Sequence, residues 1–301
     1  MDKILSGLKD IVGEANVLTD EAMKKHTSFK IGGPARLFVT PESKEQIRDL
    51  VKFCRDNNEE FFILGNGSNL LVGDDGYKGI VIQLFNKFNR IELDGNEIYA
   101  EAGALLSLIA NTAAKNSLTG FEAASGIPGT LGGAVVMNAG AYGFEMKDVV
   151  SYVRVLTKDG QIEEVAGCDM AFGYRSSVCI ENEYVVLGAK LKLAKGDETA
   201  IRERMKELKE QRVSKQPLEF PSAGSTFKRP EGYFAGKLIM DAGLRGYSIG
   251  GAQVSEKHCG FVINKGNATA KDVLDLVAYI QKTVMDRAGV ALEMEIKKLG
   301  V

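Results

Sequence analysis

A glycine-rich stretch, SGIPGTLGGAVVMNAGAYG at residues 125–143, has a composition that suits ligand binding better than ordinary core packing. Six of its nineteen residues are glycine and none is charged. Glycine costs conformational entropy inside a helix, so the stretch is poorly suited to a stable exposed helix. Its main-chain N–H groups could instead lie close to a flat or anionic ligand. Taken alone, the same composition is equally compatible with a set of tight β-turns.

A second glycine-rich segment, ILGNGSNLLVGDDG at residues 63–76, begins at the end of a short apolar run that predicts a buried strand. The two glycines of GNGSN allow unusual backbone angles, and Ser68 and Asn69 can donate hydrogen bonds. This combination suits a diphosphate held without basic side chains. The pattern is not a GxGxxG that opens a helix, so an ordinary Rossmann site is not supported. A strand-terminal turn remains the alternative, but two such segments predict two walls around one ligand.

Two polar side chains lie where they could act on a ligand. Ser225 is placed in AGSTFKRP, on what must be a loop, with Lys228 and Arg229 close behind it. A loop serine is commonly a turn or capping residue, yet adjacent cations indicate an anion nearby. Arg175, which follows Tyr174, is equally compatible with a surface ion pair.

The last segment carries two alternating carboxylates. Glu293 and Glu295 share one face of the strand predicted by VALEMEI, and the apolar residues between them share the other. An exposed polar face would explain this pattern without any function. His258, in SEKHCGF, is by default a structural histidine.

The residue inventory excludes several chemistries. The chain has two histidines, so a histidine-built metal site is not expected, and we predict no metal. No serine lies in a GxSxG elbow, and no GxxxxGK[ST] phosphate loop is present. The glycine-rich segments therefore need an explanation other than ester or nucleotide hydrolysis.

Composition indicates an ordinary globular protein. Of its 301 residues, 45% are hydrophobic and 26% are charged, and the net charge is -2. No overall basic field calls for nucleic acid or an anionic membrane. The four cysteines are scattered without a CxxC pair, as in reduced cytosolic proteins. With no signal-peptide pattern and no apolar run of transmembrane length, we expect a cytoplasmic protein without a membrane partner.

Periodicity predicts helices mixed with strands. Helical spacing predicts five helices, at 2–14, 43–58, 105–117, 197–217 and 269–289. Asp-Gly pairs predict two β-hairpins, at 90–103 and 150–165. The resulting α+β organisation is divided into residues 1–77, residues 78–196 and residues 197–301, and the charged helix opens the third part. We expect the final strand, near 291–301, to return to the first two parts.

Taken together and in order, these motifs resemble those of the UDP-N-acetylenolpyruvoylglucosamine reductases, flavoproteins of bacterial peptidoglycan precursor synthesis. The resemblance covers nearly the whole chain and is carried by seven motifs: TSFKIGGPA (27–35), ILGNGSNLL (63–71), the stretch 125–143, YR (174–175), AGSTFKRP (223–230), GGAQVSEKHCGFVINKGNAT (250–269) and LEMEI (292–296). The chain has no room for the extra tyrosine-bearing loop of one family type, so it is similar to the shorter, second type.

The resemblance implies an FAD-binding fold of the vanillyl-alcohol-oxidase (PCMH) type. On this basis residues 1–77 and 78–196 form its two subdomains, and residues 197–301 form an α+β substrate-binding domain. Neither glycine-rich segment contains histidine or cysteine, so FAD is expected to be held non-covalently. We expect a monomer, because no apolar stripe is left over for a partner.

The resemblance also implies a role for particular residues. The catalytic residues would be Arg175, Ser225 and Glu295. The cofactor-binding residues would be Gly65, Asn66, Gly67, Ser68, Asn69, Leu70, Ser125, Gly126, Ile127, Pro128, Gly129, Thr130, Gly132, Gly133, Ala139 and Gly140. The substrate-binding residues would be Tyr174, Lys215, Lys228, Arg229 and His258.

The implied reaction is reduction of the enolpyruvyl ether of a UDP-sugar by NADPH through FAD. A hydride from flavin N5 would reach the vinyl carbon, Arg175 and Glu295 would stabilise the resulting enolate, and Ser225 would protonate it. Two other interpretations remain open. One is a different oxidoreductase on the same flavin fold, and the other is a flavin- or nucleotide-sugar-binding protein without turnover.

Overall fold

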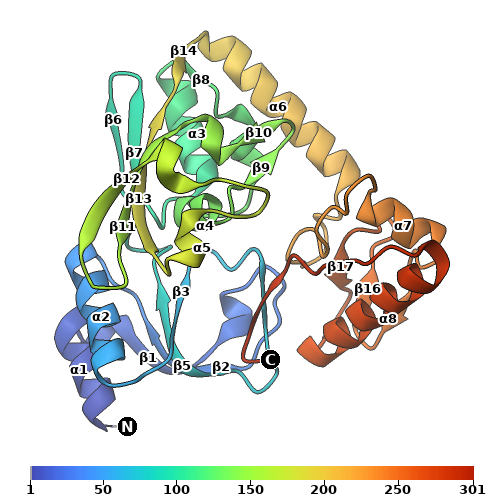
Figure 1. Ribbon diagram of the computed structural model, residues 1–301, viewed down its shortest axis with the longest axis horizontal. Coiled ribbons are helices and arrows are strands. Elements are labelled where there is room, and N and C mark those ends of the chain that lie inside the picture. Colours follow the sequence, from blue (N-terminus) through green and yellow to red (C-terminus); the bar gives the residue numbers. More distant parts are fainter. Residues whose placement is uncertain (1) are drawn as a thin grey trace. The chain divides into compact units, whose positions relative to one another are not determined.

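The computed structural model describes residues 2–301, which form two compact units (Figure 1). The first unit comprises the chain up to Leu18, residues 37–66 and residues 79–212. The second comprises residues 19–36, residues 67–78 and residues 213–301. Each unit is therefore built from separate stretches of sequence. The three-part division 1–77, 78–196 and 197–301 stays a prediction.

Eight α-helices lie in the described part of the chain. They are α1 (Asp2–Val12), α2 (Lys44–Asp56), α3 (Leu106–Lys115), α4 (Leu131–Val136), α5 (Val178–Glu181), α6 (Glu198–Lys215), α7 (Ala235–Asp241) and α8 (Ala270–Ala288).

The strands of the same residues are mostly short. They are β1 (Val17–Ala22), β2 (Pro34–Val39), β3 (Phe61–Leu64), β4 (Leu70–Val72), β5 (Tyr77–Gln83), β6 (Ile91–Asp94), β7 (Glu97–Glu101), β8 (Leu118–Thr119), β9 (Gly140–Ala141), β10 (Phe144–Glu145), β11 (Val150–Leu156), β12 (Ile162–Ala166), β13 (Val185–Lys192), β14 (Ala194–Lys195), β15 (Ser248–Ile249), β16 (Ala252–Val254), β17 (Val262–Asn264) and β18 (Lys297–Leu299).

The first unit is organised around an antiparallel sheet with the strand order β12-β11-β13-β7-β6. Alternate residues of its strands are buried; in β7, for example, Ile98 and Ala100 have no exposed surface. Helix α4 packs on β13 and β7, and α3 packs on β7 (Figure 1). One apolar face of the sheet is thus covered by helices, as the period-two alternation of its strands requires.

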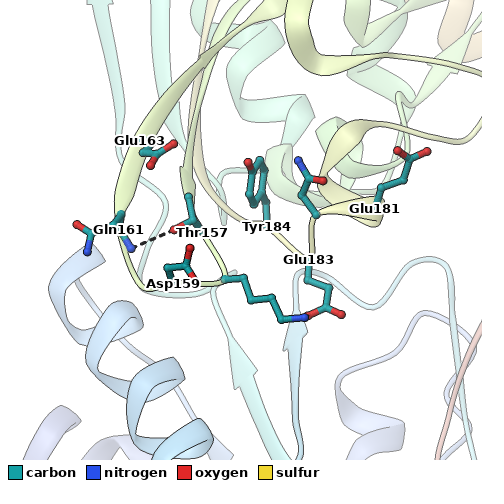
Figure 2. A pocket seen from close by; sticks show the side chains of 9 residues that line it. Thr157, Asp159, Gln161, Glu163, Glu181, Glu183 and Tyr184 are labelled. Carbon is teal, nitrogen blue, oxygen red and sulfur yellow. Dashed lines mark hydrogen bonds and ion pairs between the residues drawn. The ribbon is translucent and has the colours of Figure 1, made fainter.

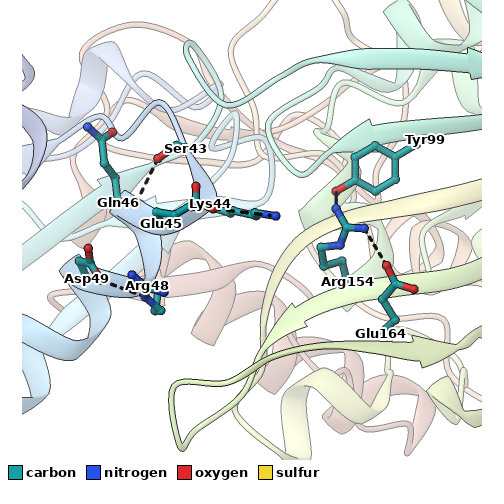
Figure 3. Close-up of polar contacts among 9 residues, drawn as sticks. All are labelled: Ser43, Lys44, Glu45, Gln46, Arg48, Asp49, Tyr99, Arg154 and Glu164. Carbon is teal, nitrogen blue, oxygen red and sulfur yellow. Dashed lines mark hydrogen bonds and ion pairs between the residues drawn. The ribbon is translucent and has the colours of Figure 1, made fainter.

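Polar contacts on this unit fix a helix start and a strand pair (Figure 3). The Ser43 hydroxyl accepts a hydrogen bond from Gln46 N at 3.2 Å and caps α2. Arg154 on β11 donates from Nη2 to Glu164 Oε1 on the neighbouring β12 at 2.7 Å, and from Nη1 to the hydroxyl of Tyr99 on β7, two strands away, at 3.2 Å. Burial raises the pKa of Tyr99, so its hydroxyl stays protonated at neutral pH. A cavity of about 440 Å³ lies along this face of the sheet.

A further sheet has the strand order β1-β2-β5-β3, with β3 and β5 parallel. The chain passes from one unit to the other within β1, β2, β5 and α6, and also after β3. The passage after β3 occurs between Asn66 and Gly67, inside the segment GNGSN.

The second unit has its own apolar core, formed by α7, α8, the small sheet β15-β16-β17 and the segment around Phe29. Strand β18 pairs in parallel with β4, so that Lys297 lies opposite Leu70. Residues near the end of the sequence are thus joined to those that follow GNGSN.

Helix α8 begins with an unusually complete set of caps. The Thr269 hydroxyl accepts from Asp272 N at 3.0 Å, and the Asp272 carboxylate accepts from Thr269 N at 3.0 Å. Asp74 accepts from the N–H groups of Ala270 and Lys271 at 2.8 and 3.1 Å. All of these otherwise unpartnered amides are therefore satisfied within the second unit.

The five helices predicted from periodicity are confirmed, and so are the two β-hairpins. Three short helices escape that prediction, namely α4 inside the glycine-rich stretch, α5 and α7. Helix α4 forms because Leu131 and Val135 have fully buried side chains, and this packing outweighs the poor helix propensity of its two glycines. The final strand, predicted near 291–301, is shorter than expected, since regular pairing covers only Lys297–Leu299 and a single bridge joins Met294 to Phe227.

Thr269→Ala should lower the free energy of unfolding by about 1 kcal/mol, because it removes one half of the capping box. Urea denaturation measures this, with Thr283→Ala on the exposed part of α8 as the matched control, which should cost nothing. The capping hydrogen bond from Thr269 N lowers the pKa of Asp272. The ionised Asp272 carboxylate therefore contributes its full stabilisation well above pH ~4. This contribution is lost as the pH falls below the pKa of Asp272 in the unfolded state. Equal losses in the two variants would contradict the cap.

Candidate functional site

Two glycine-rich segments meet within the first unit. The Asn66 side chain donates a hydrogen bond from Nδ2 to Pro128 O at 2.7 Å. A Cβ atom on Gly65 would lie 2.3 Å from Thr130 Oγ1, so only glycine allows this approach. The part of the first segment that lies in this unit is therefore in direct contact with the stretch 125–143, as the prediction of two adjoining walls requires.

The stretch 125–143 is partly explained by packing rather than by a ligand. Leu131 N and Gly132 N donate to Ala104 O and Ala102 O, both at 2.8 Å. A Cβ on Gly132 would lie 2.9 Å from that of Ala102. Gly133, by contrast, is exposed, and its nearest neighbour at the Cβ position is Thr130 Oγ1 at 4.0 Å. Gly132 thus serves helix packing, whereas the edge at Gly133 is open to a ligand.

Arg175 lies in a tight turn of the first unit. Its backbone has φ +55°, and Gly173 and Ser176 on either side form an isolated bridge. The guanidinium carbon is 5.1 Å from the ring centroid of Tyr174. Lys147 lowers the pKa of the nearby Glu145 most, with Asn138 and the Arg175 charge acting in the same direction. Glu145 is therefore ionised at neutral pH and offsets part of the Arg175 charge.

Asn138 connects the glycine-rich stretch to the Arg175 turn, and the sequence analysis missed this residue. Its side chain is buried, with Nδ2 donating to Gly173 O at 3.1 Å and to Glu145 Oε2 at 2.9 Å. Its Oδ1 accepts from Lys147 N at 3.0 Å. With φ +40°, position 138 also favours asparagine, which tolerates the left-handed region better than most residues. The available signal was a single asparagine within a stretch made mostly of small and apolar residues.

In the second unit, main-chain hydrogen bonds bring Ser225 and Glu295 into neighbouring positions. Glu295 N donates to Thr226 O at 2.9 Å. From the GNGSN segment, Asn69 Nδ2 donates to Glu295 O at 3.4 Å, and Lys297 N donates to Asn69 O at 3.0 Å. Ser225 is exposed and Glu295 is half-buried. A hydroxyl and a carboxylate are thus attached to adjoining stretches of backbone at one surface.

Thr226 anchors this arrangement and is a second residue that the sequence analysis missed. Its side chain is fully buried. The Thr226 amide donates to Gly260 O at 2.8 Å, and the Thr226 hydroxyl accepts from Val262 N at 2.8 Å. The loop that carries Ser225 is consequently fixed to the segment after His258. No local pattern distinguishes this threonine from an ordinary loop residue.

His258 is held as a neutral ring. Burial lowers the pKa of His258, and its Nδ1 accepts a hydrogen bond from Gly260 N at 3.1 Å. In the neutral ring the proton then lies on Nε2. The ring packs edge-on against Phe261, with centroids 5.0 Å apart. His258 can therefore donate one hydrogen bond from Nε2 without carrying a charge.

Three basic residues predicted to bind substrate lie in the second unit. Lys228 pairs with Glu293, and the Arg229 guanidinium carbon lies 4.1 Å from the ring centroid of Phe234. Lys215 is exposed at the end of α6. Arg175 belongs to the first unit and Ser225 to the second, and their assignment to one catalytic site stays a prediction.

A cavity of about 450 Å³ lies elsewhere on the first unit, beside the turn between β11 and β12 (Figure 2). It is lined mainly by carboxylates and amides, and Lys158 pairs with Glu183 at 3.0 Å. None of the predicted site residues lines it. Among residues 2–301 there is no cluster of three side chains suited to a metal ion. None of the helices in that range is both long and apolar enough to cross a membrane.

Two family models match the chain. Residues 216–299 match the C-terminal domain of UDP-N-acetylenolpyruvoylglucosamine reductase, and residues 35–166 match an FAD binding domain. Residues 65–66 and the stretch 125–143 both lie within the second of these matches.

Similar proteins cover nearly the whole chain. UDP-N-acetylenolpyruvoylglucosamine reductase of Caldanaerobacter subterraneus is 55% identical over 99% of this chain and 98% of its own length. The protein of the same name from Clostridium tetani is 53% identical over 98% of this chain and 96% of its own length.

Two solved structures are similar to this chain. UDP-N-acetylenolpyruvylglucosamine reductase from Thermus caldophilus has a TM-score of 0.79 and 36% identity, covering 94% of this chain and 98% of that one. The 4-ethylphenol oxidase of Gulosibacter chungangensis has a TM-score of 0.51 and 15% identity, covering 64% of this chain and 42% of that one. At that identity the likeness shows the fold alone, and it supports the predicted vanillyl-alcohol-oxidase type.

Asn138→Ala should lower the free energy of unfolding by about 1–3 kcal/mol, because the Gly173 carbonyl and Lys147 amide lose their buried partner. Asn111→Ala is the matched control, since the exposed Asn111 side chain donates a hydrogen bond to Ser107 O of the same helix. It should change stability by less than about 0.5 kcal/mol. Thermal unfolding of both variants measures the difference. An unchanged Asn138→Ala midpoint would mean that the Arg175 turn does not depend on this amide.

Proposed function

Since the chain belongs to the UDP-N-acetylenolpyruvoylglucosamine reductase family, we propose that it reduces UDP-N-acetylenolpyruvoylglucosamine to UDP-N-acetylmuramate, with FAD as cofactor and NADPH as reductant. The observation that carries this proposal is the 55% identity to a reductase of that name over 98% of its length. The arrangement of Ser225 and Glu295 on adjoining backbone segments supports it. Both residues fall in motifs that the sequence analysis associates with the same family.

The residues present fit a flavin nucleotide. The two glycine-rich segments adjoin through Asn66 and Pro128, and residues 125–133 carry no charged side chain. The open edge at Gly133 leaves main chain within reach of a flat ligand. The flavin, when bound, supplies the hydride that reaches the vinyl carbon of the substrate. Neither segment carries a histidine or cysteine, so we expect the flavin to be held non-covalently.

Hydride addition places negative charge on the neighbouring carbon and its carboxylate. In the proposed mechanism, Arg175 donates hydrogen bonds to this enolate, and Glu295 contributes a second fixed contact. Preorganisation matters here, because donors already aimed at the developing charge need no reorientation during the reaction. Asn138 and Glu145 hold the Arg175 turn, and Thr226 holds the backbone beside Glu295.

Ser225 then donates its hydroxyl proton to the enolate carbon. A serine hydroxyl is a weak acid and needs a strongly basic acceptor, which a carbon enolate provides. Its exposure lets it reach a ligand, and its attachment to buried Thr226 fixes its position. Lys215, Lys228, Arg229 and His258 are assigned to the diphosphate and carboxylate of the substrate, together with Tyr174.

Arg175→Lys should reduce turnover severely although the charge is retained. A lysine ammonium is a point charge and cannot reproduce the planar fork that a guanidinium offers a carboxylate or enolate. Steady-state oxidation of NADPH with the UDP-sugar measures turnover. Arg202→Lys, in an exposed pair with Glu198, is the matched control and should behave like the wild type. Near-normal turnover of Arg175→Lys would remove Arg175 from the mechanism.

Ser225→Ala should separate the two halves of the reaction. Reduction of the flavin by NADPH needs no proton from Ser225 and should proceed at the normal rate. Product formation should fall about 10²–10⁴-fold, as when a positioned general acid is removed. Stopped-flow absorbance at the flavin band follows the first half, and quantification of UDP-N-acetylmuramate follows the second.

A cysteine at position 225 should retain more product formation than alanine, because a thiol can also donate a proton. Ser6→Ala, which removes an exposed hydroxyl of α1, is the control and should form product like the wild type. If Ser225→Ala forms product at the wild-type rate, the protonation step is wrongly assigned. If the wild type oxidises NADPH equally without the UDP-sugar, the substrate itself is wrong.

A further inference from the structure

Arg212 lies across the glycine-rich stretch, although it comes almost seventy residues later in the sequence. It belongs to the last turn of α6, within the first unit. Its Cδ and Nη1 atoms are 3.3 and 3.5 Å from the position that a Cβ on Gly126 would take. The absence of a side chain at Gly126 therefore makes room for the Arg212 guanidinium beside the main chain of this stretch.

Three other cations of α6 are paired with carboxylates of the same helix, and Lys209 and Lys215 are exposed to solvent. Arg202 lies 2.6 Å from Glu198, Arg204 lies 2.5 Å from Glu207, and Lys206 lies 4.0 Å from Glu210. Arg212 is half-buried, yet within residues 2–301 its guanidinium makes neither a hydrogen bond nor an ion pair.

Burial disfavours the charge on Arg212. Desolvation lowers the pKa of Arg212, and only Tyr142 acts in the opposite direction. A half-buried cation without a carboxylate or an acceptor is costly to the folded protein. A side chain that served only to pack against Gly126 would not need a guanidinium.

The positive charge of Arg212 lies beside a glycine-rich stretch that has no basic residue of its own. The segments 63–72 and 125–143 contain no lysine or arginine. An FAD molecule held by these segments brings two negative charges on its diphosphate, and its ring becomes anionic when reduced. Main-chain amides provide partial charges only, whereas Arg212 brings a full positive charge and a planar set of donors to the same surface.

We propose that Arg212 binds an anionic group of the FAD, either the diphosphate or the ring of the reduced form. This assignment rests on the flavin cofactor and not on the proposed UDP-sugar chemistry. The bound anion supplies the partner that the guanidinium lacks in the protein alone. Glycine at position 126 leaves space for this side chain to lie close to the backbone.

The first test compares Arg212→Met with Arg204→Met, the same substitution at an exposed position on α6. Both apoproteins are prepared by removing the flavin, and each is then titrated with FAD by fluorescence. Arg212→Met should weaken FAD binding about 10- to 100-fold, the worth of a hydrogen-bonded charge. Arg204→Met should bind FAD like the wild type.

Thermal unfolding separates a ligand contact from a structural role. Without FAD, Arg212→Met should unfold at the same temperature as the wild type or higher, because a costly unpaired charge has been removed. With saturating FAD, it should unfold at a lower temperature than the wild type. A purely structural arginine would lower the unfolding temperature in both states and leave FAD affinity unchanged, and that result would overturn the proposal.

Two further measurements identify the anionic group. If Arg212 binds the diphosphate, riboflavin, which lacks it, should bind the variant and the wild type equally. If Arg212 instead binds the ring, riboflavin should also bind the variant more weakly than the wild type, and the midpoint potential of the bound flavin should fall. If FAD affinity and potential are both unchanged, and only the UDP-sugar binds more weakly, the proposal is wrong. Arg212→Lys, which keeps the charge, should show an intermediate defect and replaces the methionine variant if that one does not fold.

Discussion

The buried Thr226 is the point on which the second unit's part of the site depends. Its amide, carbonyl and hydroxyl bind Gly260, Glu295 and Val262 respectively. Three segments that are far apart in the sequence thus meet at one side chain without exposed surface. A buried hydroxyl of this kind is satisfied only in one arrangement, since leaving the Val262 amide without a partner is costly. The geometry of the serine and the glutamate is therefore set by a neighbour that need not touch the substrate.

The first unit uses the same principle with a different side chain. Asn138 satisfies a carbonyl of the Arg175 turn, and a carboxylate and an amide of the segment 145–147. In both units, a small buried polar residue fixes the exposed groups that are assigned to chemistry. Flexible side chains at the surface thereby gain defined positions from rigid backbone, which is how preorganised sites reduce the cost of reorientation.

Local sequence patterns predicted what local interactions determine. The spacing of Ile47, Leu50 and Val51 predicted α2, and their side chains are buried as that helix requires. The contacts of Thr226 and Arg212 join residues 69 and 86 positions apart, and no periodicity encodes such distances. The glycines show the same limit. Gly65 and Gly132 were predicted to approach a ligand, but they are also needed for contact with Thr130 and Ala102, which composition alone does not distinguish.

The pairing of β4 with β18 has a consequence for biosynthesis. Residues 70–72 leave the ribosome more than two hundred residues before their parallel partner at 297–299. Closing so long a loop is slow compared with forming local helices and hairpins. Strand β4 must therefore wait, without its strand partner, until residues 297–299 have been made. The first unit, which needs nothing beyond residue 212, can fold during that delay, so the nascent chain passes through a state in which only one of the two units has formed.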